Sequence, residues 1–120
     1  PDDIRKVLKF FPINSISEVK ILFPDPWPKK KHINRRLIQN EFIKILYLII
    51  KHQGTVTIAT DHDLLKNWVL EKFQEFNKFV WLAESSNDWR YRPDDCFQTK
   101  YELKSINQQR KPSWFIFKKI

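Results

Sequence analysis

A single carboxylate stands between prolines in the segment FPDPWPKKKH, residues 23–32. The prolines fix the backbone angle φ and lack N–H donors, so we expect a stiff turn that holds Asp25 in a defined place. Trp27 adds a flat apolar surface beside it. A carboxylate held in this way can accept hydrogen bonds from two adjacent N–H groups, such as those on the Watson–Crick edge of guanine.

Positive charge follows this carboxylate directly. Five cations lie within eight residues and are joined by His32: Lys29, Lys30, Lys31, Arg35 and Arg36. Such cations can hold phosphate groups and position a nucleic-acid strand. A proline-rich loop with solvated charge would explain each feature taken alone. Their combination at the end of a predicted strand favours a nucleic-acid site.

The segment ATDHD, residues 59–63, is a second candidate. Asp61 is placed to act on a ligand, but an acid at the N-terminus of a helix needs no ligand to explain it. His62 and Asp63 suggest a metal site or an acid–base pair, yet adjacent positions of a helix point apart. We therefore keep Asp61 and discount the pair.

The third candidate is the segment TKYE. In an extended chain Thr99 and Tyr101 would face one way, and Lys100 and Glu102 the other. By chemistry alone this signal is weak. Cys96 is the single cysteine. No motif places a histidine beside it, so we expect neither a catalytic thiol nor a cysteine-rich zinc site.

Hydrophobic patterns predict the elements that must position these residues. They indicate helices at 2–11, 34–52 and 61–76, strands at 18–23, 55–60, 79–83 and 113–119, and a polar loop at 84–98. Gly54 is interpreted as the C-terminal signal of the second helix, which makes His52 a cation at its end. Thr60 and Asp63 resemble a capping box for the third helix.

Strands that alternate with helices predict an α/β architecture, with a mostly parallel sheet and flanking helices in one domain over residues 1–120. Asp25 and Asp61 each follow a predicted strand. Ligands of open α/β sheets bind beyond the carboxyl ends of the strands, so we expect both acids at the same edge of the sheet.

Composition narrows the class of partner. Lys and Arg number 22 against 14 for Asp and Glu, a net charge of +8 that favours nucleic acid first and an anionic membrane second. The longest apolar run, residues 45–50, is far short of the ~20 residues that span a bilayer, so we expect a cytoplasmic protein. Gly54 is the only glycine, which excludes a G-x-G nucleotide loop within these 120 residues.

The segment FPDPWPKKKH, with RRL at 35–37, closely resembles the hallmark of the bacterial tRNA (guanine-N7-)-methyltransferase family. The resemblance continues through TD at 60–61 and TKYE at 99–102, and covers nearly the whole chain. It implies a Rossmann-like class I methyltransferase fold that binds S-adenosylmethionine. It also implies methylation of N7 of a guanosine in the variable loop of tRNA, with no metal and no membrane involved.

The resemblance also implies roles for individual residues. Asp25 matches the active-site aspartate, which lies at the cofactor, and Asp2 matches a cofactor-binding acid. Substrate binding is implied for the following residues: Lys29, Asp61, Thr99, Lys100, Tyr101 and Glu102. From their charge, Arg35 and Arg36 are expected to touch tRNA phosphate. Because guanine N7 already carries a lone pair, the enzyme needs chiefly positioning and electrostatics rather than a strong base.

The sequence departs from the family pattern in several places. The family carries a Gly-rich loop and a further ribose-binding acid upstream of these motifs, and neither is present in the chain. Cys96 and Phe97 stand where Arg-Pro is common, and the segment 105–113 lacks the usual glycines. The chain therefore resembles the C-terminal portion of the enzyme, an N-terminally truncated domain whose own binding of S-adenosylmethionine is doubtful. Two alternatives stay open: a catalytically inactive relative that retains at most tRNA binding, and an unrelated basic module that binds nucleic acid.

Overall fold

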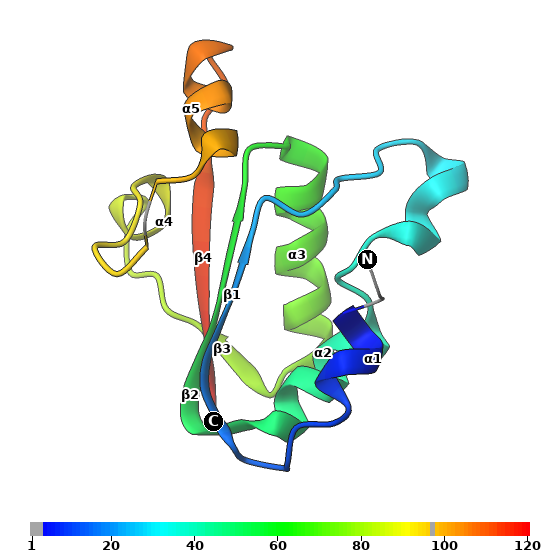
Figure 1. Cartoon of the computed structure of the whole chain (residues 1–120). Coiled ribbons are helices and arrows are strands. Elements are labelled where there is room, and N and C mark those ends of the chain that lie inside the picture. The colour runs from blue at the N-terminus through cyan, green and yellow to red at the C-terminus, as the bar shows by residue number, and fades with distance from the viewer. Residues whose placement is uncertain (1–3, 97) are drawn as a thin grey trace.

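Figure 1 shows the computed structural model of the chain, which describes residues 4–96 and 98–120. Asp2, predicted to bind the cofactor, lies outside the described residues. The elements in chain order are α1 (Ile4–Leu8), β1 (Ile16–Leu22), the 3₁₀ helix η1 (Lys30–Arg35), α2 (Asn40–Ile49), β2 (Ile50–Thr60), α3 (Asp63–Phe76), β3 (Phe79–Trp81), α4 (Asn87–Arg90), α5 (Lys100–Asn107) and β4 (Ser113–Lys119).

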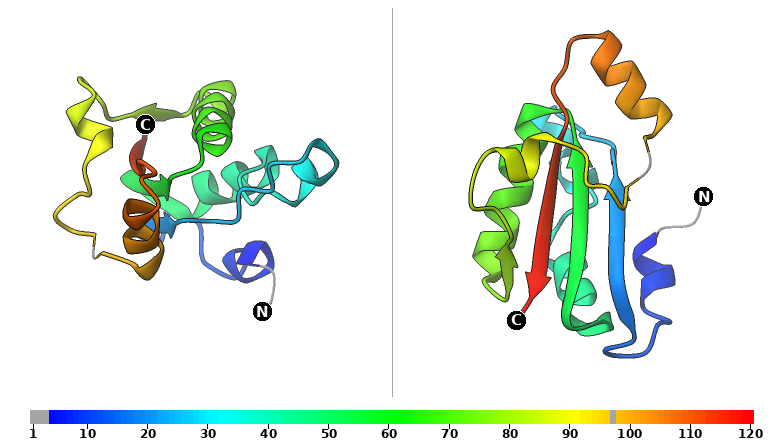
Figure 2. Two further views of the ribbon diagram at one scale, coloured as in Figure 1. Left: turned by 90° about the horizontal axis from the view of Figure 1, so that it is seen from above. Right: turned by 90° about the vertical axis from the view of Figure 1, so that its left-hand side faces the viewer.

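The four strands form one mixed sheet in the order β1-β2-β4-β3. β1 pairs with β2 in parallel, and β4 pairs antiparallel with both β2 and β3. Consequently β1, β2 and β3 point the same way, and only β4 runs against them (Figure 2). The predicted α/β architecture is confirmed, with β4 as the antiparallel exception.

Helices α2 and α3 cover one side of the sheet, and α1 packs on α2 (Figures 1 and 2). Phe42 and Leu46 of α2 and Val69 and Phe73 of α3 are buried in the core. The Phe73 ring stacks on Phe117 of β4, with ring centroids 4.0 Å apart and an angle of 8° between the planes. Aromatic stacking of this kind adds to the area buried and fixes α3 against the sheet.

The predicted helix at 34–52 is wrong at both ends. Residues 30–35 form η1, α2 begins only at Asn40, and the chain enters β2 at Ile50. Gly54 and His52 are therefore strand residues, not the end of a helix. A Cβ on Gly54 would lie 2.5 Å from Ile50 Cγ2 and 2.8 Å from the carbonyl oxygen of Ser17. The glycine is needed because β1 approaches closely where its pairing with β2 is irregular.

Other boundaries shift by smaller amounts. β1 covers 16–22 rather than 18–23, α1 ends at Leu8, β3 ends at Trp81, and the predicted loop at 84–98 contains α4. The strand predicted at 113–119 is confirmed. The capping box at Thr60 does not form, because its hydroxyl accepts from the backbone N–H of His62 and α3 begins after His62.

Candidate functional site

The turn after β1 leaves the sheet through two residues in the left-handed region of backbone space. Phe23 has φ of 56° and Trp27 has φ of 42°. The backbone N–H of Phe23 still donates to the carbonyl of Ala59, at 2.7 Å, which ties the start of the turn to β2. Asp25 lies between these points and is exposed. The stiff turn predicted from the prolines thus presents its carboxylate to solvent at the carboxyl end of β1.

Arg36 holds the other end of this turn. Its Nε donates to the carbonyls of Pro26 and Trp27, at 3.0 and 3.2 Å. The guanidinium lies over the Trp68 ring of α3, 4.7 Å from its centroid, and the residue is only 5% exposed. The guanidinium is thus engaged within the chain, and the contact of Arg36 with tRNA phosphate stays a prediction. Arg36 positions the turn that carries Asp25.

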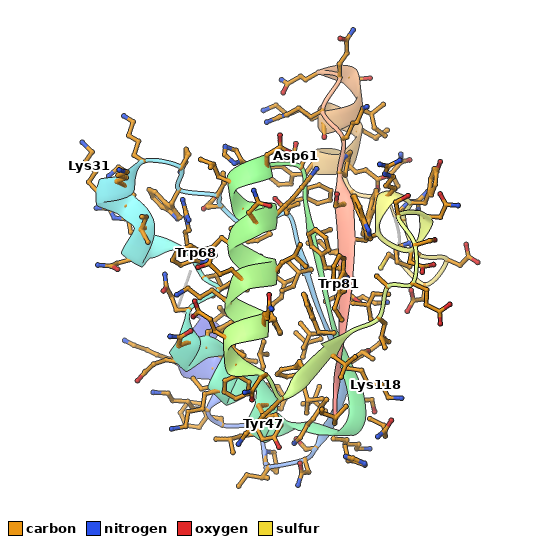
Figure 3. All side chains as sticks on the ribbon, turned by 180° about the vertical axis from the view of Figure 1, so that it is seen from behind. Lys31, Tyr47, Asp61, Trp68, Trp81 and Lys118 are labelled. Carbon is orange, nitrogen blue, oxygen red and sulfur yellow. The ribbon has the colours of Figure 1, made fainter. Side chains whose placement is uncertain are left out.

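The remaining cations of the turn and of η1 face solvent. Lys29, Lys30, Lys31 and Arg35 are exposed. Arg35 lies over the ring of Trp27, with 5.1 Å between its guanidinium carbon and the ring centroid. Figure 3 shows Lys31 pointing away from the body of the molecule. These side chains form a basic projection that is free to bind an anionic strand.

The carboxyl ends of β1 and β2 meet at a hollow of about 130 Å³. Asp25 lines it from the turn after β1, Asp61 from the turn after β2, and Tyr101 from α5. The expectation that both acids lie at one edge of the sheet is met. Tyr101 is 64% exposed, and its ring stacks on Phe23 with centroids 6.4 Å apart.

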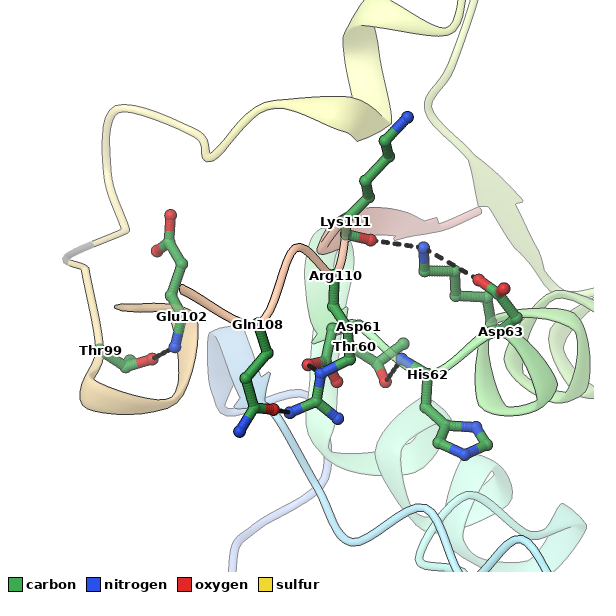
Figure 4. Close-up of polar contacts among 10 residues, drawn as sticks. Thr60, Asp61, His62, Asp63, Thr99, Glu102, Gln108, Arg110 and Lys111 are labelled. Carbon is green, nitrogen blue, oxygen red and sulfur yellow. Dashed lines mark hydrogen bonds and ion pairs between the residues drawn. The ribbon is translucent and has the colours of Figure 1, made fainter. Parts of the chain in front are cut away.

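Asp61 does not face the hollow with a free carboxylate. Its Oδ2 lies 3.1 Å from Nε of Arg110, and the Arg110 guanidinium also donates to Gln108 (Figure 4). Sequence reasoning missed Arg110. It lies far from Asp61 along the chain, and only the antiparallel insertion of β4 brings the two together.

His62 also lines the hollow. Its Nδ1 is buried and has no hydrogen-bond partner among the described residues. Buried polar atoms without partners are rare in folded proteins.

The segment TKYE begins a helix rather than continuing an extended chain. Thr99 is the N-cap of α5, and its Oγ1 accepts from the backbone N–H of Glu102 at 3.0 Å (Figure 4). Glu102 is 5% exposed and pairs with Nε of Arg92 at 3.4 Å. Thr99 and Glu102 thus hold α5, while Lys100 and Tyr101 on its first turn are exposed. The spacing T-x-x-E is a capping-box signature, so the sequence did contain this signal.

The described residues were compared with the requirements of a metal site and of a reactive thiol. No group of three or more His, Cys, Asp or Glu side chains there is arranged to hold a metal ion. Burial raises the pKa of the Cys96 thiol, which disfavours the reactive thiolate. No helix in the described part of the chain is long and apolar enough to cross a membrane.

Comparison with known proteins identifies the family. Residues 1–114 match the model of a family described as "Putative methyltransferase". The chain belongs to this family. It is 35% identical over 119 residues to the tRNA (guanine-N(7)-)-methyltransferase of Rhodospirillum rubrum and 38% identical over 118 residues to that of Hyphomonas neptunium. These matches cover 99% and 98% of the chain but 47% and 53% of the relatives. The methyltransferase chain therefore spans about half the length of the curated relatives it matches.

Solved structures show the same methyltransferase fold. A SAM dependent methyltransferase from Archaeoglobus fulgidus superposes with a TM-score of 0.51 at 14% identity, covering 98% of this chain and 66% of that one. A "Putative DNA Modification Methylase" from Thermus thermophilus, complexed with S-adenosyl-L-methionine, gives a TM-score of 0.56 at 12% identity, covering 98% and 50%. The predicted resemblance and the predicted methyltransferase fold are confirmed.

The described residues do not form a complete site for S-adenosylmethionine. The hollow of about 130 Å³ is smaller than the roughly 300 Å³ at which ligand pockets begin. The one glycine of the methyltransferase chain lies inside β2, where it allows close contact with β1, and not in a loop at the hollow. Asp25 lines this hollow, and its contact with the cofactor stays a prediction.

Proposed function

We propose that this chain forms the RNA-facing half of a tRNA (guanine-N7-)-methyltransferase. In that reaction a methyl group passes from S-adenosylmethionine to N7 of a guanosine in the variable loop of tRNA. The observation that carries the proposal is the convergence of Asp25 and Asp61 on one hollow, beside a projection of exposed cations. The names of the relatives support the same activity.

Binding and orientation of the guanine are the tasks of the hollow. The N7 lone pair is already available, so the residues need only hold the base and keep N7 exposed. Asp25 supplies carboxylate oxygens for the N1–H and N2–H groups of the base. Asp61, whose Oδ2 is paired with Arg110, offers only its second oxygen, Oδ1. The Phe23–Tyr101 pair supplies a flat apolar surface.

The backbone of the RNA is assigned to the exposed cations. Lys29 and Arg35, at the turn and on η1, are placed for phosphates on one side of the hollow, and Lys100 at the start of α5 for those on the other. Thr99 and Glu102 act by holding α5 and thus Tyr101. The cofactor role of Asp2 remains a prediction. Because tRNA is the substrate, we assign the protein to the cytoplasm.

The proposal is tested by the dependence of tRNA binding on the target base. The dissociation constant of the 120-residue chain would be measured for a tRNA transcript and for the same transcript with the target guanosine changed to adenosine. We expect the adenosine transcript to bind about tenfold more weakly, since it reverses the donor pattern that the carboxylates recognise.

Asp25→Asn supplies the matched variant, because an amide pairs less well with two donors. It should weaken binding of the guanosine transcript and reduce the preference for guanosine, whereas Asp94→Asn, at an exposed loop acid, should change neither. Equal affinity of the wild-type chain for the two transcripts would contradict the proposal.

A further inference from the structure

A second and larger depression shares the lining residue Arg110 with the hollow. Its volume is about 810 Å³, and it lies between the segment after α4, helix α5 and the approach to β4. Arg110 lines both depressions. Because one residue lines both, the hollow and the groove are neighbours, and we expect an RNA strand that leaves the hollow to reach the groove. We call it the Tyr91 groove, after the most exposed aromatic residue that lines it.

The charge of the Tyr91 groove favours an anion. Five of its lining residues are cations, and Glu102 is the one acid among them. Glu102 is already paired with Arg92, at 3.4 Å. Arg90 and Lys111 have no acidic partner among the described residues, and Figure 4 shows the Lys111 side chain extending away from the pairs around Asp61 and Asp63. These two side chains are therefore available for a phosphate.

The aromatic residues of the groove favour a base. The Tyr91 side chain is 67% exposed at the groove. Next to it, Trp89 is fixed by packing against Phe115 and carries the Arg90 guanidinium 5.3 Å above its ring. An exposed ring beside cations is the combination by which proteins bind single-stranded nucleic acid, with bases stacked on rings and phosphates held by cations.

We propose that the Tyr91 groove binds the unpaired nucleotide next to the target guanosine, with its base on Tyr91 and its phosphate at Arg90 and Lys111. The volume of about 810 Å³ is ample for a nucleotide. This inference rests on the proposed function, because it takes the target guanosine to occupy the hollow, which shares Arg110 with the groove. It adds a second contact point that orients the RNA strand.

The test combines a protein variant with an altered tRNA. The dissociation constant of the 120-residue chain would be measured by fluorescence anisotropy for a tRNA transcript, and for transcripts with an abasic residue at either neighbour of the target guanosine. One abasic transcript should bind the wild-type chain about tenfold more weakly, as expected for loss of one stacked base. Tyr91→Ala should weaken binding of the intact tRNA by a similar factor and make the chain insensitive to that abasic residue.

Two controls separate stacking from unfolding. Tyr91→Phe keeps the ring and should retain wild-type affinity and abasic sensitivity. Phe10→Ala removes another exposed ring, 87% exposed and away from the groove, and should change neither.

The outcomes distinguish this inference from the proposed function. If Tyr91→Ala binds like wild type, or remains as sensitive to the abasic residue, the groove assignment is overturned. The proposed function then stands as long as the target guanosine is still preferred. Loss of that preference, or no tRNA binding by the wild-type chain, overturns both.

Discussion

Two neighbouring arginines serve different purposes at the residue scale. Arg35 is exposed and lies over Trp27, whereas Arg36 is buried, donates to two backbone carbonyls and lies over Trp68. The two residues are of the same type and adjacent in the sequence, but Arg35 is the last residue of η1 and Arg36 follows it. Their side chains therefore differ in burial because they leave the backbone in different directions. Arg36 therefore stabilises the turn that carries Asp25, and we call this contact the clamp; Arg35 remains exposed.

Substitution of these arginines should separate stability from binding. Arg36→Ala leaves two carbonyl oxygens of the turn without their donor, so we expect the free energy of unfolding to fall by about 1–3 kcal/mol. Arg35→Ala should change it by less than about 0.5 kcal/mol, as for an ordinary surface site, but should weaken tRNA binding. Urea unfolding and binding assays on both variants check this. Equal stability of the two variants would contradict the clamp.

Residue types alone predicted only part of the site. The prolines around Asp25 and the strand before Asp61 were sufficient to place both acids at one edge of the sheet. Arg110 could not be found, because its contact with Asp61 depends on where β4 inserts. Burial of Arg36 was equally hidden, since the sequence does not show that α3 presents Trp68 to it.

At the scale of elements, the short helix α4 depends on a side chain that accepts hydrogen bonds from backbone N–H groups before it. Asp88 accepts hydrogen bonds from the backbone N–H groups of Glu84 and Ser85, at 2.8 and 3.1 Å, and so closes the turn that begins α4. These two hydrogen bonds lower the pKa of the Asp88 carboxyl below its ordinary value of 3.8. The turn positions Trp89, which packs on Phe115 beside the Tyr91 groove.

The closed turn makes stability depend on pH in a defined direction. Because the folded-state pKa of Asp88 is lowered, its contribution is fully present above the unfolded-state value near 3.8 and is lost as pH falls through the lowered folded-state pKa. Asp88→Asn should remove this contribution to the pH dependence. Urea unfolding of both proteins between about pH 5 and pH 2.5 measures it. An unchanged difference in unfolding free energy between the two proteins over that range would contradict the role of the charge.

The sequence predicted helices and strands correctly where its pattern is typical of one structure, and wrongly where the same residues are typical of two. The run SWFIFKK is apolar, aromatic and preceded by proline, and its bounds as β4 were predicted correctly. Gly54 is equally compatible with the end of a helix and with close packing of strands. The prediction of a helix end is wrong, because Gly54 lies in β2. The alternation of side chains in TKYE predicts an extended chain, whereas its first and fourth residues, Thr99 and Glu102, form the N-terminal cap of α5.

At the scale of the whole molecule, the methyltransferase fold is present without a complete place for the methyl donor. β1 is the first strand of the sheet order, and its pairing within the described residues is with β2 alone. The chain covers about half the length of relatives that carry the same motifs. We therefore expect that binding of tRNA and binding of S-adenosylmethionine by this chain can be distinguished by experiment.

Calorimetry provides that separation. We expect titration of the 120-residue chain with S-adenosylmethionine to give no measurable heat of binding. No glycine lies at the hollow to let the backbone approach the methionine moiety, and the hollow itself is small. The same preparation should still bind tRNA, which serves as the control for folding. Clear micromolar affinity for S-adenosylmethionine would show that the described residues hold more of the cofactor site than their geometry indicates.

The position of β4 in the sheet has a consequence for the order of folding. Within the described residues, β4 lies between β2 and β3, so the pairing of β3 depends on a strand that is synthesised later and ends at Lys119. β1 and β2 are closer in the sequence and can pair before β4 is available. Closure of the sheet therefore depends on a long-range pairing, of the kind that slows folding. The same pairing brings Arg110 to Asp61, so the candidate RNA site is completed only when the sheet closes.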